Sequence, residues 1–385
     1  MFSPDNTKFS TEEQDRYARQ IALPSLGVEG QKKLKQAKVA VVGAGGLGAP
    51  LLQYLAAAGV GTIGIFDFDK VETSNLQRQV LYAETDVGKQ KAEVTGERLR
   101  AINPHIKIDV HDTKITPNNA VSLFDSYDLV AEGSDNFLTK YVVNDACLIL
   151  DIPLVFGSIY QFEGQVSVFN YVDEKGLRGP EYRDFFPNVP EQGFIPNCAQ
   201  AGVMGALPGI VGSMQAMEMI KIITGIGEVL SGSMLVVDAL NMDVTKMQIP
   251  INPEKKTVDK ELVQKRLTAL AEINEQKERD SGTDISEISA EKLQDLMQQQ
   301  EDVVLVDVRT VEEHQSFNIG GELFPLQKLI DTDTLPKIFN EDNVILYCET
   351  GVRSSKAIEI LRQKFDTQNL LNLKGGMSAW RMMEG

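Results

Sequence analysis

Glycines and acids that could bind a nucleotide lie together early in the chain. Gly43, Gly45 and Gly48 form a G-x-G-x-x-G turn between an apolar run and a helical pattern. Such glycines let backbone N–H groups approach a phosphate at a helix N-terminus. Asp67 ends the next apolar run, where an acid can accept ribose hydroxyls. The pattern predicts a nucleotide site and leaves NAD, FAD and ATP open.

More charged residues follow in the same part of the chain. They are Arg16, Arg19, Arg78, Lys91, Asp67, Asp69 and Asp135. Cations, together with carboxylates able to hold Mg²⁺, suit phosphoryl or nucleotidyl transfer, because charge develops on phosphate oxygens in the transition state. An NAD-dependent oxidoreductase would need an acid or base beside the hydride site, and nothing in the sequence points to one. It stays an alternative.

Three cysteines are the candidate nucleophiles, and they are too scattered for a disulfide framework. Cys348 follows an apolar run and precedes a helical pattern, so loop N–H groups and the helix N-terminus favour a thiolate, and Arg353 adds positive charge. Cys348 is therefore a candidate persulfide carrier. Cys198 precedes a helical segment, which favours a reactive thiol. Cys147 lies in an apolar context and is expected in the core.

Alternating strand and helix patterns must position these residues. Strands are expected near 39–42, 62–66, 106–110, 127–131, 153–157, 165–169 and 234–238, with helices near 11–20, 87–100, 136–150 and 201–224. Ligands of open α/β sheets bind at the carboxyl edge, where the polar residues fall. The fold class is α/β, with a mostly parallel, Rossmann-like sheet and a second, small α/β domain.

The composition changes twice along the chain. Residues 176–197 lack periodicity and predict a long crossover loop. We expect an ATP-binding domain at 1–250, a charged, exposed helical linker at 251–284 and the small α/β domain at 285–385.

The overall composition excludes several classes. The chain has 385 residues, a formal charge of -17 and 42% hydrophobic residues, which is ordinary for a globular protein and unfavourable for binding nucleic acid or an anionic membrane. It has no apolar run of about 18 residues and no basic-then-apolar N-terminus, so a cytoplasmic protein without signal or anchor is expected.

Eight motifs, in a fixed order over residues 11–248, point to one protein family. They are RYARQ, GAGGLG, DFD, SNLQRQ, VGKQK, SDN, EGQVSVF and AGVMG-x-LPGIVGSMQAMEMIK. Together they resemble the ubiquitin-activating-like adenylyltransferases of the HesA/MoeB/ThiF type, which activate small sulfur carriers. The resemblance implies ATP with Mg²⁺, and a site in which Gly46 lies at the phosphates, Asp67 at the ribose and Asp135 at the magnesium ion. It places Asn75, Gln77, Arg78 and Lys91 near the phosphates, and the SDN motif adds Asn136.

The same resemblance implies a reaction and partners. The carboxylate of a ubiquitin-like carrier ending in Gly-Gly would attack the α-phosphate, giving an acyl-adenylate and pyrophosphate. Arg16 would reach across a homodimer into the partner's site, and Cys198 would carry a transient acyl intermediate. The molybdopterin, thiamine and tRNA thiolation pathways stay open.

One departure concerns zinc. Such adenylyltransferases commonly hold zinc with two CxxC pairs, and Glu181 and Asp184 stand where the first pair is expected. The chain has no CxxC pair, so no zinc site is expected.

The second domain resembles a rhodanese. The motifs VDVRT-x-EEH, CETGVRSS and LKGGMSAW carry this resemblance. Four residues separate Cys348 from Arg353, one fewer than in related phosphatase loops, which favours sulfur transfer. Glu349 places an anion beside the site, so the expected donor is a protein persulfide, such as that of a cysteine desulfurase, rather than thiosulfate. Alternatively, this domain only docks a partner.

Overall fold

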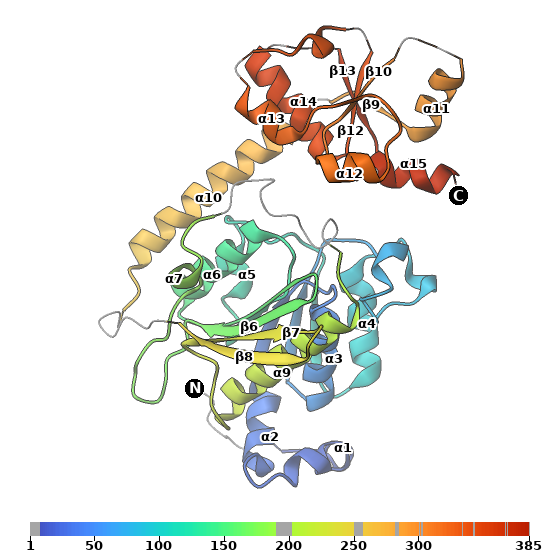
Figure 1. Cartoon of the computed structure of the whole chain (residues 1–385). Helices are drawn as coiled ribbons and strands as arrows, with labels where there is room; N and C mark the ends of the chain where they lie inside the picture. Colours follow the sequence, from blue (N-terminus) through green and yellow to red (C-terminus); the bar gives the residue numbers. More distant parts are fainter. Residues whose placement is uncertain are drawn as a thin grey trace. The chain divides into compact units, whose positions relative to one another are not determined.

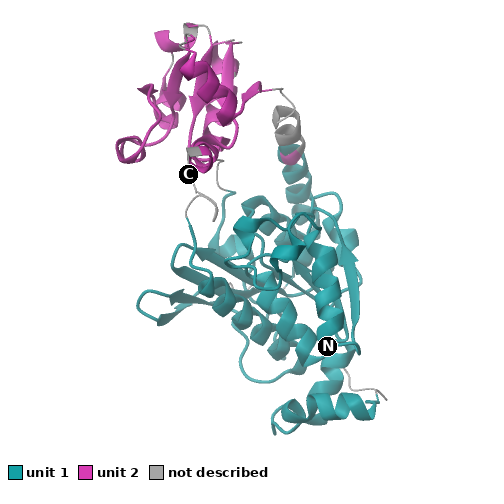
Figure 2. Ribbon diagram, turned by 90° about the vertical axis from the view of Figure 1, so that its right-hand side faces the viewer, with its two compact units in different colours: residues 1–273 teal, residues 274–385 magenta. Residues whose placement is uncertain are grey.

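The computed structural model describes residues 8–189, 202–249, 257–281, 285–299, 301, 303–332, 334–341, 343–365, 367 and 369–384. The chain forms two compact units, residues 1–273 and 274–385 (Figures 1 and 2). Each unit has its own sheet and core.

The larger unit is built on an eight-stranded sheet in the order β3-β2-β1-β4-β5-β6-β7-β8. Five strands are parallel, namely β1 (Lys38–Val42), β2 (Thr62–Phe66), β3 (Lys107–His111), β4 (Leu129–Glu132) and β5 (Leu154–Tyr160). The antiparallel strands are β6 (Glu163–Phe169), β7 (Ser233–Asp238) and β8 (Asp243–Gln248). The expected mostly parallel sheet is confirmed. The sequence did not predict β8, because all six of its residues are exposed and show no alternation.

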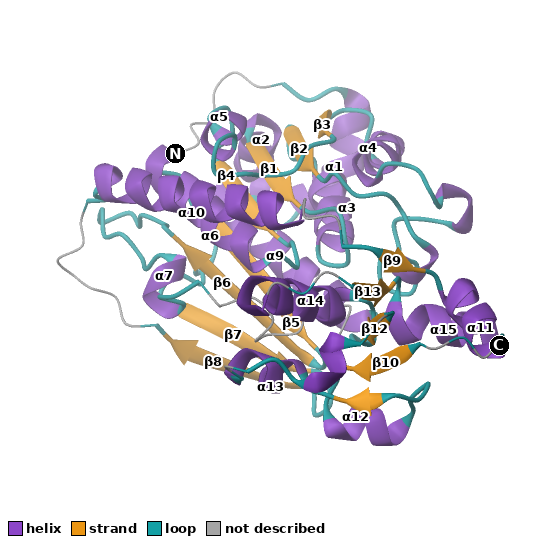
Figure 3. Ribbon diagram, turned by 90° about the horizontal axis from the view of Figure 1, so that it is seen from above, coloured by secondary structure: helices purple, strands orange, loops and turns teal. Residues whose placement is uncertain are grey.

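Helices cover both faces of this sheet (Figure 3). On one face α2 (Gly27–Gln36), α3 (Gly48–Ala58), α4 (Lys91–Ile102) and α9 (Ala206–Thr224) contribute to one apolar core. On the other, α5 (Ala120–Phe124), α6 (Phe137–Leu150), α7 (Tyr182–Phe185) and α10 (Lys260–Ser281) contribute to a second core. Leucine and alanine at helical spacing supply these faces, as in any three-layer α/β domain.

One helix agrees with its expected bounds and one expectation is corrected. Helix α1 (Thr11–Ile21) is capped by Ser10, which forms a reciprocal capping box with Glu13. Helix α10 is not wholly exposed, since Val263, Leu267 and Leu270 are buried, and the two leucines belong to the second core of the larger unit. Their spacing of four and three residues places them on one helix face.

The smaller unit has a five-stranded parallel sheet in the order β11-β10-β12-β13-β9. Its strands are β9 (Glu287–Ile288), β10 (Val304–Asp307), β11 (Glu322–Leu323), β12 (Val344–Tyr347) and β13 (Leu370–Leu373). Its helices are α11 (Ala290–Gln298), α12 (Val311–Ser316), α13 (Leu326–Asp331), α14 (Val352–Phe365) and α15 (Gly376–Glu384). Two apolar clusters cover its faces, so the small α/β domain is confirmed.

Short 3-10 helices complete the order of elements: η1 (Thr73–Asn75) and η2 (Glu84–Asp86) in the larger unit, and η3 (Lys337–Asn340) in the smaller. In the larger sheet the strand order reverses at β1, which lies between β2 and β4. A crevice forms at such a switch point, outside the carboxyl ends of the strands.

Candidate functional site

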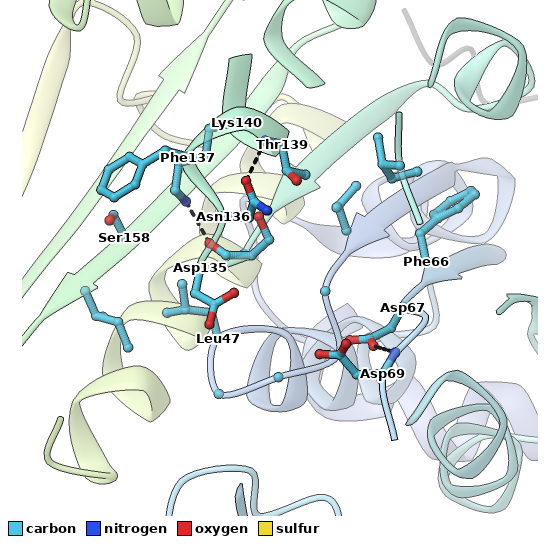
Figure 4. Close-up of a pocket in the computed structure, with 18 of the residues that line it drawn as sticks. Leu47, Phe66, Asp67, Asp69, Asp135, Asn136, Phe137, Thr139, Lys140 and Ser158 are labelled. Carbon is cyan, nitrogen blue, oxygen red and sulfur yellow. Dashed lines mark hydrogen bonds between the residues drawn. The ribbon is translucent and has the colours of Figure 1, made fainter. Parts of the chain in front are cut away.

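A cavity of about 420 Å³ lies at this crevice. Of the residues expected to bind nucleotide, Gly43, Gly45, Gly46, Asp67, Asp69, Arg78, Lys91, Asp135 and Asn136 line it. Figure 4 shows Asp67 and Asp69 after β2, with Asp135 and Asn136 on the turn between β4 and α6. The strand register thus brings together groups that are distant in the sequence.

The glycine turn is shaped by one close approach and one hydrogen bond. A Cβ atom added to Gly48 would lie 1.9 Å from the carbonyl oxygen of Gly43, so only glycine fits there. Gly43 itself has a φ of 90°, which side chains avoid. The N–H of Ala44 donates to Asp67 Oδ2 at 2.7 Å. The turn is therefore held rigidly beside the carboxylate that ends β2.

Asp67 is both a support and a candidate ligand. Its Oδ1 accepts from the N–H of Asp69 at 2.9 Å. Burial raises the pKa of Asp67 above its ordinary value, although the hydrogen bond from Ala44 and the charge of Lys91 oppose that shift. Each carboxylate oxygen has a further lone pair, so Asp67 can still accept hydroxyl groups from a ribose.

Lys91 and Arg78 are two of the cations that line the cavity. Lys91 is buried, and its Nζ lies 3.1 Å from Asp69 Oδ2. Arg78 is partly exposed and donates from Nη1 to the carbonyl oxygen of Ser74 at 2.9 Å. No other hydrogen bond engages its guanidinium among the residues described, so its other donors can meet an anion. Their charges suit a polyphosphate.

Asp135 is the carboxylate best suited to a magnesium ion. It is exposed to the cavity, and no hydrogen bond or ion pair engages it among the residues that the structure describes. Asn136 next to it caps α6 by accepting from the N–H of Thr139 at 3.3 Å. Mg²⁺ bound with substrate phosphates needs only one or two protein carboxylates, so the residues present fit this ion. No cluster of three or more metal-ligating side chains occurs in the described ranges.

Lys140 and Gln79 are among the lining residues that were not predicted from the sequence. Lys140 Nζ lies 2.6 Å from Glu132 Oε2 in a buried ion pair, and it also donates to the carbonyl oxygen of Ser134 at 2.9 Å. A lone cation in the apolar pattern of 137–150 was the available signal. Gln79 is 4% exposed, and no donor in the described part of the chain bonds its Oε1. It ends the SNLQRQ motif, which could have singled it out.

Other expected residues lie outside the cavity lining. Asn75 is buried, and its Oδ1 accepts from the N–H of Glu72 at 3.3 Å, which organises the loop. Gly48 supports the turn from behind, and Gln77 packs against Gly205. Arg16 donates to the carbonyl oxygen of Ile102 at 3.0 Å on the surface.

The thiol loop of the smaller unit begins where β12 ends. Cys348 is buried, and its Sγ accepts from the N–H of Gly351 at 3.2 Å and from Ser354 Oγ at 3.4 Å. Gly351 has a φ of 86°, which turns its N–H towards the sulfur. Arg353 follows in the first turn of α14 and forms a two-fold ion pair with Glu313, at 2.6 and 2.7 Å. These donors would stabilise a sulfur anion at Cys348.

The other two cysteines are not part of the thiol loop. Cys147 is buried in α6, and burial raises the pKa of its thiol well above the ordinary value, so its expected core role is confirmed. Cys198 lies outside the described residues.

Polar contacts engage Glu181 and Asp184, which stand where zinc-binding cysteines are expected in the family. Arg266 Nη1 of α10 lies 3.3 Å from both carboxylate oxygens of Glu181. The Asp184 carboxylate accepts from the N–H of Glu181 at 2.9 Å. Arg183 pairs with buried Asp145 at 2.7 Å, and burial raises the pKa of that carboxyl despite the pair. These contacts tie the segment after β6 to α6 and α10.

Two family models match the chain. Residues 17–258 match the ThiF family, and residues 289–383 match the rhodanese-like domain.

Curated relatives match over most of their length. The probable adenylyltransferase/sulfurtransferase MoeZ of Mycobacterium tuberculosis is 44% identical over 96% of this chain and 93% of its own. The sulfur carrier protein adenylyltransferase of Thermus thermophilus is 50% identical over 68% of this chain and 96% of its own. The adenylyltransferase and sulfurtransferase MOCS3 of Culex quinquefasciatus is 36% identical over 97% and 88%.

A solved structure supports the fold of the larger unit. The crystal structure of E. coli MccB with ATP is 26% identical and covers 62% of this chain and 73% of its own, with a TM-score of 0.53. Within the described ranges, no helix is long and apolar enough to cross a bilayer.

Proposed function

The chain belongs to the ThiF family and carries a C-terminal rhodanese-like domain, and from this premise we propose that it activates the C-terminus of a ubiquitin-like sulfur carrier and supplies it with sulfur. It is an adenylyltransferase with a sulfurtransferase domain, like the relatives named MoeZ and MOCS3. The observation that carries the proposal is the cavity, which joins a glycine turn, the cations Lys91 and Arg78 and the carboxylate of Asp135, which is unpaired among the described residues.

The first step is nucleotidyl transfer. A carboxylate oxygen of the carrier's terminal glycine attacks the α-phosphorus of ATP, and the bond to the β-phosphate oxygen breaks, so pyrophosphate leaves and an acyl-adenylate forms. Lys91 and Arg78 stabilise the charge on the phosphate oxygens, and the N–H groups of the glycine turn orient the phosphates. Asp135 would hold Mg²⁺, which supplies further charge neutralisation when bound.

The second step is sulfur transfer. We assign Cys198 a transient acyl intermediate: its thiolate attacks the carbonyl carbon of the acyl-adenylate, and AMP leaves with the electron pair. The outer sulfur of a Cys348 persulfide then attacks that carbonyl carbon, and the Cys198 thiolate leaves. A second thiol attacks the Cys348 Sγ and breaks the S–S bond, which releases the carrier thiocarboxylate and leaves a disulfide.

Several finer assignments belong to the same proposal. They are a homodimer in which Arg16 reaches the partner's nucleotide, a cysteine desulfurase as sulfur source, a cytoplasmic location and absence of zinc. The pathway is molybdopterin, thiamine or tRNA thiolation, and molybdopterin is favoured because a relative is named a probable molybdopterin-synthase adenylyltransferase.

ATP–pyrophosphate exchange with a Gly-Gly-ending carrier tests the first step. Asp135→Ala should lower the exchange rate by roughly a hundredfold, since one group that stabilises phosphate charge is lost. The exposed Asp125, at the end of α5, gives the control Asp125→Ala, which should exchange like the wild type. Full exchange in Asp135→Ala would refute the assigned role. A titration in which NAD binds and ATP·Mg²⁺ does not would favour an oxidoreductase instead.

Mass spectrometry of the carrier tests the second step. The thiocarboxylate should form with the wild-type enzyme and disappear with Cys348→Ala, while pyrophosphate exchange persists. A thiocarboxylate that still forms at the wild-type rate would mean that the rhodanese-like domain only docks a partner.

A further inference from the structure

A carboxylate within the thiol loop forms ion pairs with two arginines beside that loop. Glu349 directly follows Cys348, and its Oε2 accepts from Arg309 Nη1 at 3.3 Å and from Arg381 Nη2 at 3.4 Å. A second Arg381 nitrogen donates to Glu349 Oε1, and Ser378 Oγ donates to the same oxygen at 3.5 Å. Glu349 thus makes charged contacts to two arginines, one in the loop after β10 and one in α15.

These two arginines are held in place without Glu349. Arg309 is 1% exposed, and its Nε and Nη2 contact Asp307 at 3.0 and 2.8 Å. Its Nη2 also donates to the carbonyl oxygen of Phe317, and the Arg381 guanidinium lies over the Phe317 ring. If the Glu349 carboxylate were removed, both cations would keep these contacts and would have donors to offer to another anion.

The third arginine of the site is already paired. Arg353 is engaged by Glu313 through both nitrogens, which holds the pKa of Glu313 down at about 2. A dianion such as thiosulfate therefore finds each of the three arginines near the thiol loop paired with a carboxylate. It would have to displace a carboxylate that is covalently part of the site.

The surface around the loop also carries exposed apolar groups. Val352, inside the loop, is 60% exposed, and Phe317 is 41% exposed. Apolar side chains beside an ion-paired cluster fit a protein surface better than a small dianion, because a partner can bury them.

We propose that Glu349 is a specificity residue that fills the arginine pair Arg309 and Arg381, excluding small anionic sulfur donors, so that Cys348 receives sulfur from a thiol-bound persulfide. This inference rests on the proposed sulfur transfer and adds the residue that selects the donor. In the favoured reaction the Cys348 thiolate attacks the outer sulfur of R–S–SH, its S–S bond breaks, R–S⁻ leaves and Cys348–S–SH remains. In the excluded reaction the thiolate attacks the sulfane sulfur of thiosulfate and sulfite leaves with the electron pair.

The test compares donors in the full-length protein. Sulfur transfer to cyanide is measured as thiocyanate, with thiosulfate or with cysteine persulfide as donor. Glu349→Gln keeps the shape of the side chain and removes its charge. Glu349→Ala also removes the side-chain atoms that contact the two arginines. We expect kcat/KM for thiosulfate to rise roughly tenfold or more in both variants, because two arginines become available to the dianion. Glu359→Gln is the matched control, since this acid lies on α14 and pairs with Lys356 only among the described residues.

Each outcome decides one claim. A rise with thiosulfate in the Glu349 variants but not in Glu359→Gln supports the proposal. Unchanged thiosulfate use in folded Glu349 variants that still accept sulfur from cysteine persulfide overturns it, and the proposed function survives. If the wild type accepts sulfur from neither donor, and no carrier thiocarboxylate forms, both claims are refuted.

Discussion

Lys140 Nζ lies 2.6 Å from Glu132 Oε2, and both side chains are buried beside the proposed nucleotide cavity. The pair is linked to the turn after β4, because Lys140 also donates to the carbonyl oxygen of Ser134 and the N–H of Ser134 donates to Glu132 Oε1 at 2.8 Å. Asp135 is the next residue. The buried pair therefore fixes the backbone that presents the proposed magnesium ligand.

Lys140→Met should destabilise the larger unit strongly. Removing one partner leaves the Glu132 carboxylate buried without a cation, which costs about 3–5 kcal/mol. Urea unfolding measures the change, with Lys107→Met as control. Lys107 is exposed, so its removal should cost less than about 0.5 kcal/mol even though it pairs with Asp109. Equal losses in the two variants would contradict the role given to the buried pair.

Some features of the site could be predicted from the sequence alone, and others could not. The glycine turn and the thiol loop are local, so their glycines, cysteine and following helices can be read directly from spacing. Lys140 could not be assigned, because its partner Glu132 is on a preceding strand and only tertiary packing brings them together. The phosphate contact of Asn75 stays a prediction from its motif, and the structure adds that its buried side chain accepts a hydrogen bond from its own loop.

Gly48→Ala should abolish nucleotide binding. The new Cβ atom would lie 1.9 Å from the Gly43 carbonyl oxygen, so the turn must shift away from the position in which Gly43, Gly45 and Gly46 line the cavity. Gly209→Ala is the control, because a Cβ atom there meets nothing within 4 Å and alanine favours the helix α9. ATP binding can be followed by calorimetry. Gly48→Ala binding ATP as tightly as Gly209→Ala would rule out this close-packed turn.

The Glu181–Arg266 ion pair should stabilise the attachment of α10. Glu181 is 5% exposed, and Arg266→Met would leave it with the Asn144 amide at 3.2 Å as a remaining side-chain donor. We expect a loss of about 1–3 kcal/mol in unfolding free energy. The exposed neighbour Lys265 supplies the control Lys265→Met.

A double-mutant cycle isolates this pair. Glu181→Gln combined with Arg266→Met should show a coupling energy of about 0.5 kcal/mol or more, and strictly additive effects would argue against the pair.

Since no zinc is expected, treatment with a chelator should leave the wild-type unfolding midpoint unchanged.

Both units should lose stability in acid, each through one identified carboxylate. The bidentate contact from Arg353 lowers the pKa of Glu313 from 4.5 to about 2, and the N–H of Ala83, followed by Lys89 and Arg98, lowers the pKa of Asp86 from 3.8 to about 2. In each case the folded pKa is below the unfolded one. The ionised carboxylate therefore stabilises the fold above the unfolded pKa, and this stabilisation is lost as the pH falls towards about 2.

Thermal unfolding measured between about pH 5 and 2 reports this loss of stability, because that range spans roughly the folded and unfolded pKa values. Glu313→Gln should be less stable than the wild type at pH 5 and should lose less further stability on acidification, because the titrating group is gone. Asp86→Asn should do the same for the larger unit. Glu322, exposed on β11 and without an ion pair among the described residues, gives the control Glu322→Gln, which should follow the wild-type curve. If Glu313→Gln and the wild type respond identically to acid, the Arg353 pair does not stabilise the thiol loop's unit.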